Sequence, residues 1–144
     1  MIEPDTIKLL RECDAGVKMG VASIGDVEKY VSDSAFKEML LRSKHEHETL
    51  GLEIDALLRE YGDEGKEPNP IAKGMSWIKT NVKLGMEDSD RVVADLLTDG
   101  CNMGVKSLRK YLNEYKAAHQ DAKDITKRLI QLEEKLADQL KDYL

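Results

Sequence analysis

The chain has 144 residues, of which 35% are charged and only 5% are aromatic. Its 28 acidic and 22 basic residues give a formal net charge of -6, which argues against nucleic acid and anionic membrane as partners. No run approaches the ~20 apolar residues that span a bilayer, and the N-terminus lacks the cationic and apolar segments of a signal peptide. The two cysteines are too few for a disulfide framework, so we expect a cytoplasmic protein. The length of the chain predicts a single domain covering residues 1–144.

The first helix is expected to begin near Pro4, because proline is tolerated in a first helical turn. Its glycines, such as Gly20, are expected to mark close approach of a neighbouring helix rather than a break. Heptad spacing selects a stripe in which six of eight positions are aliphatic. The stripe consists of Ile7, Leu10, Asp14, Val17, Val21, Ile24, Glu28 and Val31.

A stop and a new N-cap follow at residues 32–34, where Ser, Asp and Ser are grouped. The second helix then carries its own stripe and ends at Gly62. Such a short turn makes the first two helices antiparallel neighbours. The second stripe consists of Phe36, Leu40, Ser43, His47, Leu50, Ile54, Leu57 and Tyr61.

The connection from Gly62 to Asp88 is 27 residues long and contains a helical stretch of about fifteen residues that starts at Pro70. That stretch, which bears Trp77, covers roughly 22 Å. A helical crossover of this length returns the third helix parallel to the second. The alternative, a stretch lying across the end of the bundle, gives simple up-down-up-down topology. We favour the crossover.

The third helix is expected over about residues 89–115 and the fourth from within a few residues of His119. No period-two alternation indicates a strand, so the predicted fold is all-α, an antiparallel four-helix bundle. The seam of the third helix consists of Leu97, Cys101, Gly104, Leu108, Tyr111 and Tyr115. That of the fourth consists of Ala122, Ile125, Leu129, Leu132, Leu136, Leu140 and Tyr143.

This layout resembles the ferritin-like superfamily, in particular small bacterial ferritin-like proteins of unassigned function. The resemblance implies a two-metal centre, with a Glu from each of two helices and Glu-x-x-His from each of the others. The chain has no intact Glu-x-x-His, so we expect no two-iron site and no enzyme activity. The residues three positions after the candidate glutamates are Thr49 after Glu46, Ala56 after Glu53, Leu136 after Glu133 and Ala137 after Glu134.

Polar residues nevertheless interrupt the apolar seams at Asp14, Glu28, His47 and Cys101. In the crossover topology His47 lies level with Cys101. A glutamate of the fourth helix, Glu133 or its neighbour Glu134, reaches a similar level, and Asp14 lies about one turn away. His47, Cys101, Glu133 and Asp14 are therefore the candidate ligands of a single divalent metal.

The alternative, which we favour, is that these residues are structural: the histidine and cysteine pack in the core, and Asp14 and Glu28 pair with lysines or lie near exposed ends. His45 is two positions from His47, points elsewhere on a helix and is expected to be solvated.

The expected function is therefore that of a non-enzymatic bundle without a cofactor. It would act as a homodimer or through another protein partner. Met and Tyr residues near the ends of the third helix and along the connection would supply an apolar contact strip. The alternative is a metal-binding or redox-related protein that holds one divalent ion, zinc or iron.

Overall fold

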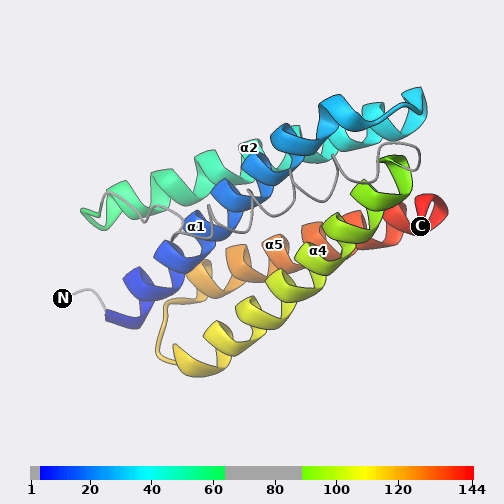
Figure 1. The fold of residues 1–144 in the computed structure, drawn as a ribbon. Coiled ribbons are helices and arrows are strands. Elements are labelled where there is room, and N and C mark those ends of the chain that lie inside the picture. The colour runs from blue at the N-terminus through cyan, green and yellow to red at the C-terminus, as the bar shows by residue number, and fades with distance from the viewer. Residues whose placement is uncertain (1–3, 64–88) are drawn as a thin grey trace.

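The computed structural model describes residues 4–63 and 89–144, which form four long helices (Figure 1). No strand occurs in these two segments, so the predicted all-α four-helix bundle is confirmed. The long helices are α1 (Pro4–Val27), α2 (Ser34–Glu60), α4 (Ser89–Glu114) and α5 (Gln120–Leu140). Short 3-10 helices, η1 (Glu28–Tyr30) and η3 (Lys141–Tyr143), follow α1 and α5.

The helix ends follow the local signals in the sequence. The side chain of Asp33 caps α2 by accepting a hydrogen bond from the backbone N–H of Phe36 at 2.8 Å. Just beyond the other end of α2, Gly62 has a φ of 77°, a left-handed conformation that glycine adopts without steric cost. Pro4 is the first residue of α1, as expected.

The direction of each helix follows from contacts between their ends. At one end, the carboxylate of Asp90 in α4 accepts from the backbone N–H groups of Ser32 and Asp33, just before α2. At the opposite end, Tyr61, just after α2, donates to Asp121 in the first turn of α5 at 2.8 Å.

The helices α2 and α4 therefore run parallel to each other and antiparallel to α1 and α5 (Figure 1). This is the relative direction predicted for a crossover. The connecting stretch itself, with Trp77, lies outside the described residues.

The helix α1 packs most extensively on α2, and α4 on α5, but α1 also contacts both α4 and α5. Its buried face is consequently wider than the heptad stripe. Leu9, Cys13 and Val27 are fully buried although they lie off the stripe, whereas Val21 and Glu28, which lie on it, are only partly buried.

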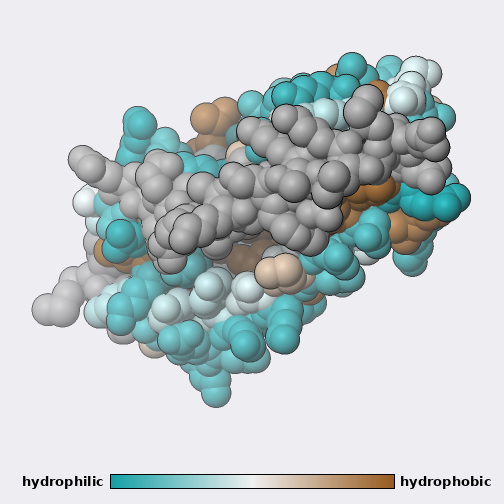
Figure 2. Space-filling model, viewed as in Figure 1, coloured by the Kyte–Doolittle hydropathy of each residue, from teal (hydrophilic) through white to brown (hydrophobic). Residues whose placement is uncertain are grey.

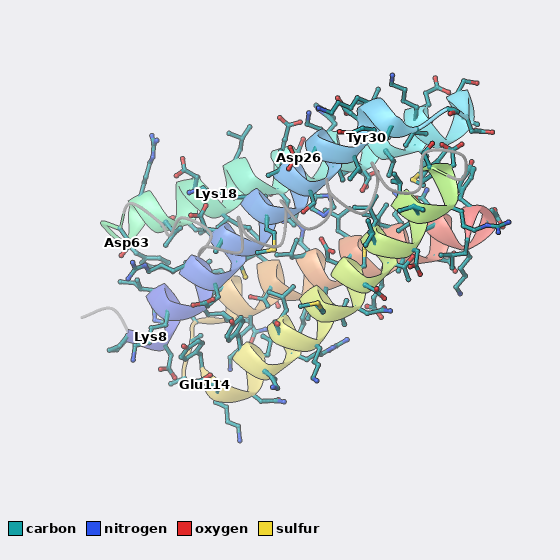
Figure 3. The ribbon with its side chains drawn as sticks, viewed as in Figure 1. Lys8, Lys18, Asp26, Tyr30, Asp63 and Glu114 are labelled. Atoms are coloured by element: carbon teal, nitrogen blue, oxygen red, sulfur yellow. The ribbon has the colours of Figure 1, made fainter. Side chains whose placement is uncertain are left out.

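The buried side chains form two apolar clusters, one toward each end of the bundle. Phe36 and Leu40 belong to the first, and Leu10 and Ile54 to the second. The coloured part of the surface in Figure 2 is mostly hydrophilic, and charged side chains such as Lys8 project from the helices into solvent (Figure 3). Among the described helices, none combines the length and the apolar content needed to cross a membrane.

Candidate functional site

A polar layer crosses the middle of the bundle between the two apolar clusters. His47 on α2 is fully buried, as predicted, and its Nε2 lies 2.5 Å from Oε1 of Glu133 on α5. The side chain of Glu133 is only 12% exposed. Cys101 on α4 is also buried, and its thiol lies within the electrostatic influence of Glu133. The structure thus brings together three of the four candidate ligands.

The protonation of His47 follows from its two partners. Its Nδ1 lies 2.7 Å from the carbonyl oxygen of Ser43, which can only accept, so Nδ1 carries a proton. Burial lowers the pKa of His47, but the hydrogen bond and negative charge of Glu133, together with smaller contributions from the Ser43 carbonyl and Glu46, raise it above 6.5. Below this raised pKa the layer holds an imidazolium–carboxylate pair.

Glycines from the two remaining helices lie against this pair, and Gly20 makes room for it. A Cβ atom on Gly20 of α1 would lie only 2.9 Å from Cδ2 of His47, closer than two carbons can pack. A Cβ atom on Gly104 of α4 would lie 3.6 Å from Oε2 of Glu133, an ordinary contact. All four helices thus contribute to the layer, and Gly20 marks a close helix approach, as expected.

Neither cysteine is an activated thiol. Burial, followed by the negative charge of Glu133, raises the pKa of Cys101. Burial also raises the pKa of Cys13 to about 12. The Sγ of Cys13 lies 3.1 Å from the hydroxyl of Thr126, which donates its own proton to the carbonyl of Ala122, so the thiol is the donor. Both side chains remain protonated at neutral pH, unlike a nucleophilic or metal-activated cysteine.

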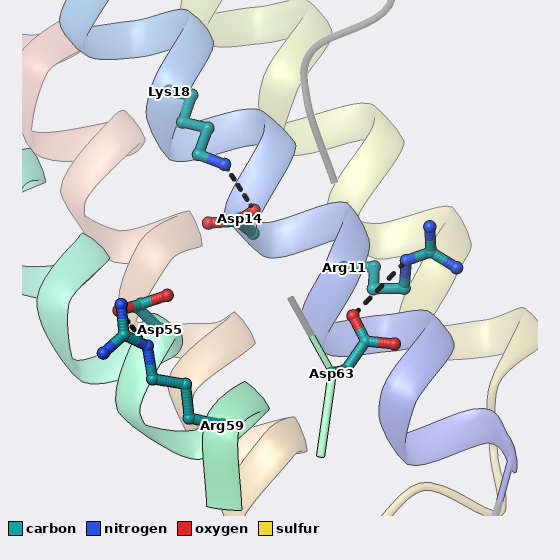
Figure 4. Close-up of polar contacts among 6 residues, drawn as sticks. All are labelled: Arg11, Asp14, Lys18, Asp55, Arg59 and Asp63. Carbon is teal, nitrogen blue, oxygen red and sulfur yellow. Dashed lines mark hydrogen bonds and ion pairs between the residues drawn. The ribbon is translucent and has the colours of Figure 1, made fainter. Parts of the chain in front are cut away.

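Asp14 lies outside the polar layer. It precedes Gly20 by six residues, ~9 Å along α1, and its carboxylate accepts from Nζ of Lys18 at 2.9 Å (Figure 4). This is the lysine pairing expected under the structural interpretation. Glu28 begins η1, and its Oε2 is buried with no hydrogen-bond partner among the described residues. His45 is exposed, as predicted.

Two ion pairs between α2 and α5 flank the layer. Arg128 donates to both carboxylate oxygens of Glu53, at 3.1 and 2.6 Å, and Lys135 bonds Glu46 at 3.0 Å. The arginine hydrogen bond lowers the pKa of Glu53. Because both ion pairs cross from α5 to α2, they help to fix the register of these two helices against each other.

Within residues 4–63 and 89–144, no three His, Cys, Asp or Glu side chains are arranged so that they could hold one metal ion. The hydrogen bond from His47 to the Ser43 carbonyl could not be predicted from the sequence, because every residue type carries the same backbone carbonyl.

No family model, curated protein or solved structure matches the chain.

Proposed function

We propose that this protein is a non-catalytic bundle that acts by associating with a second copy of itself. The observation that carries this proposal is a pair of exposed leucines on one helix. Leu41 and Leu52 of α2 are 44% and 73% exposed. They are eleven residues apart, about three helical turns, and therefore share one face. Large apolar side chains grouped on an exposed face are typical of an association surface.

The chemistry of the polar layer supports a structural role for it. Both ring nitrogens of His47 are engaged, and the thiol of Cys101 is held protonated. A buried pair that every helix helps to enclose specifies register, because any shift would leave a charge buried without its partner. We infer that the layer holds the four helices in a single alignment.

We also propose kinship with ferritin-like bundles whose metal centre has been lost. The parallel direction of α2 and α4 supports it, since a connection between them must travel the length of the bundle. Two free, buried cysteines are consistent with a reducing compartment, and we propose that the protein resides in the cytoplasm.

Sedimentation equilibrium over a concentration range from nanomolar to high micromolar tests self-association. A dimer that dissociates on dilution is the expected result. A monomer throughout this range would overturn the proposal.

A second candidate function is the binding of one divalent metal, favoured by the direct contact between the His47 imidazole and the Glu133 carboxylate. The carbonyl of Ser43 orients His47 through Nδ1, as backbone carbonyls commonly orient metal-binding histidines. A metal would take the place of the proton shared by His47 and Glu133. Titration of the chelator-treated protein with Zn²⁺ and Fe²⁺ tests this candidate. One equivalent bound, and lost on His47→Leu, would support it. Two tightly held irons would instead restore the two-metal enzyme.

A further inference from the structure

A shallow hollow lies on the outer face of α2. Its lining residues are Glu38, Leu41, Arg42, His45 and Glu46. The first four are spaced i, i+3, i+4 and i+7, the arrangement of the four-residue hole that receives one side chain of a facing helix in knobs-into-holes packing. The hollow is therefore shaped for a single apolar side chain presented by another helix.

The same face also carries a side chain that fits this hole. Leu52, the more exposed of the two leucines, follows Leu41 by eleven residues. At ~100° per residue it lies within ~20° of Leu41 around the helix. We propose that two copies of the chain dock through antiparallel α2 helices, with Leu52 of each copy inserted into the hollow of the other. The proposal rests on the self-association argued above and specifies its surface.

A two-fold axis perpendicular to α2, level with the midpoint between residues 46 and 47, generates this arrangement. The axis places Leu41 of each copy level with Leu52 of the other, so the interface contains two such contacts. Such an interface uses one patch on both copies and closes at a dimer.

The charges at the edge of this face are complementary in the same arrangement. Lys37 and Asp55 both lie ~40° from Leu41, on the same flank of the helix. The two-fold axis keeps each flank on its own side, so Lys37 of one copy comes within one residue, ~1.5 Å along the helix, of the level of Asp55 of the other. A parallel pairing would instead oppose like charges at both positions. Within one chain the two residues are eighteen positions, or ~27 Å, apart and cannot pair.

Asp55 already pairs with an exposed residue of its own helix, and this pairing is compatible with the contact to Lys37 of the second copy. Arg59 lies one turn further along α2 and bonds Asp55 at 3.1 Å (Figure 4). An arginine and a lysine can share one carboxylate, since its two oxygens offer several acceptor positions.

The first test is Leu52→Glu, measured by sedimentation velocity beside Met103→Glu. Met103 on α4 is a matched control because it is 70% exposed but lies on another helix. Leu52→Glu is expected to weaken dimerisation at least ~tenfold, as loss of a central apolar anchor does, with Met103→Glu unchanged. An unchanged dimer in Leu52→Glu, or a weakened one in Met103→Glu, would refute the docking face. Circular dichroism confirms that each variant is folded.

The second test uses charge reversal. Lys37→Glu and Asp55→Lys are each expected to weaken the homodimer, because each places like charges opposite one another twice. An equimolar mixture should restore association as a heterodimer, since both contacts then join opposite charges. Failure of the mixture to recover would refute the antiparallel register while leaving self-association standing. A wild-type chain that stays monomeric would overturn both the surface and the proposed function.

Discussion

Adding one methyl group at Gly20 should destabilise the bundle, although alanine is the better helix former. In a helix interior the replacement alone stabilises by ~1 kcal/mol. At this position, however, the new Cβ would lie 2.9 Å from Cδ2 and 3.2 Å from Nε2 of His47. The ring would have to retreat by roughly half an ångström to restore an ordinary contact, but hydrogen bonds to Ser43 and Glu133 hold it at both nitrogens.

Weakening the charged hydrogen bond to Glu133 costs ~1.5–3 kcal/mol, so Gly20→Ala should lose a net ~0.5–2 kcal/mol. Two other helical glycines serve as controls. A Cβ on Gly104, in the same layer, makes only an ordinary contact, and one on Gly100 meets no atom of the described residues within 4 Å. Both alanine variants should gain up to ~1 kcal/mol.

Urea denaturation followed by circular dichroism at pH 6 measures these differences, and each kcal/mol should also move Tm by ~2–4 °C. Gly20→Ala should fall below the wild type and the two controls above it. If Gly20→Ala proved as stable as Gly104→Ala, the close approach of α1 to His47 would not constrain the layer, and the reasoning would fail.

Three further expectations concern this layer and the two buried thiols. Glu133→Leu should cost ~3–5 kcal/mol by leaving His47 buried without its partner, and His47→Leu/Glu133→Leu should recover much of this loss in the same urea assay. Glu133 raises the pKa of His47 above 6.5 despite burial. The pair's contribution to the free energy of unfolding is therefore complete below pH 6.5. This contribution should be lost as pH rises through the folded-state pKa of His47. In the His47→Leu/Glu133→Leu variant, a pH series of unfolding free energies should not show this loss. Cys13 and Cys101 are buried with raised pKa values, so Ellman's reagent should modify them only as fast as the protein opens; rapid modification of the native protein would contradict their placement.

The sequence by itself determined the local structure, because helix ends and stripes depend on neighbouring residues. Pro4, the cap at Asp33 and the stop at Gly62 all act within a few positions of the backbone they control. Helical periodicity also determined that His47 faces inward and His45 outward. The length of the connection predicted the parallel direction of α2 and α4, since it allows travel along the bundle.

Only the tertiary structure decided how wide each buried face is and which charges meet. Leu9 and Cys13 are buried because α1 touches three helices, and periodicity within one helix carries no information about that number. Arg128 reaches Glu53 across the α2–α5 boundary, since the rotation of each helix about its axis selects among the partners available to a long charged side chain. Those rotations are set by the packing of all four helices together. The same packing places Glu133 in contact with His47, whereas Asp14 lies outside the polar layer and pairs with Lys18.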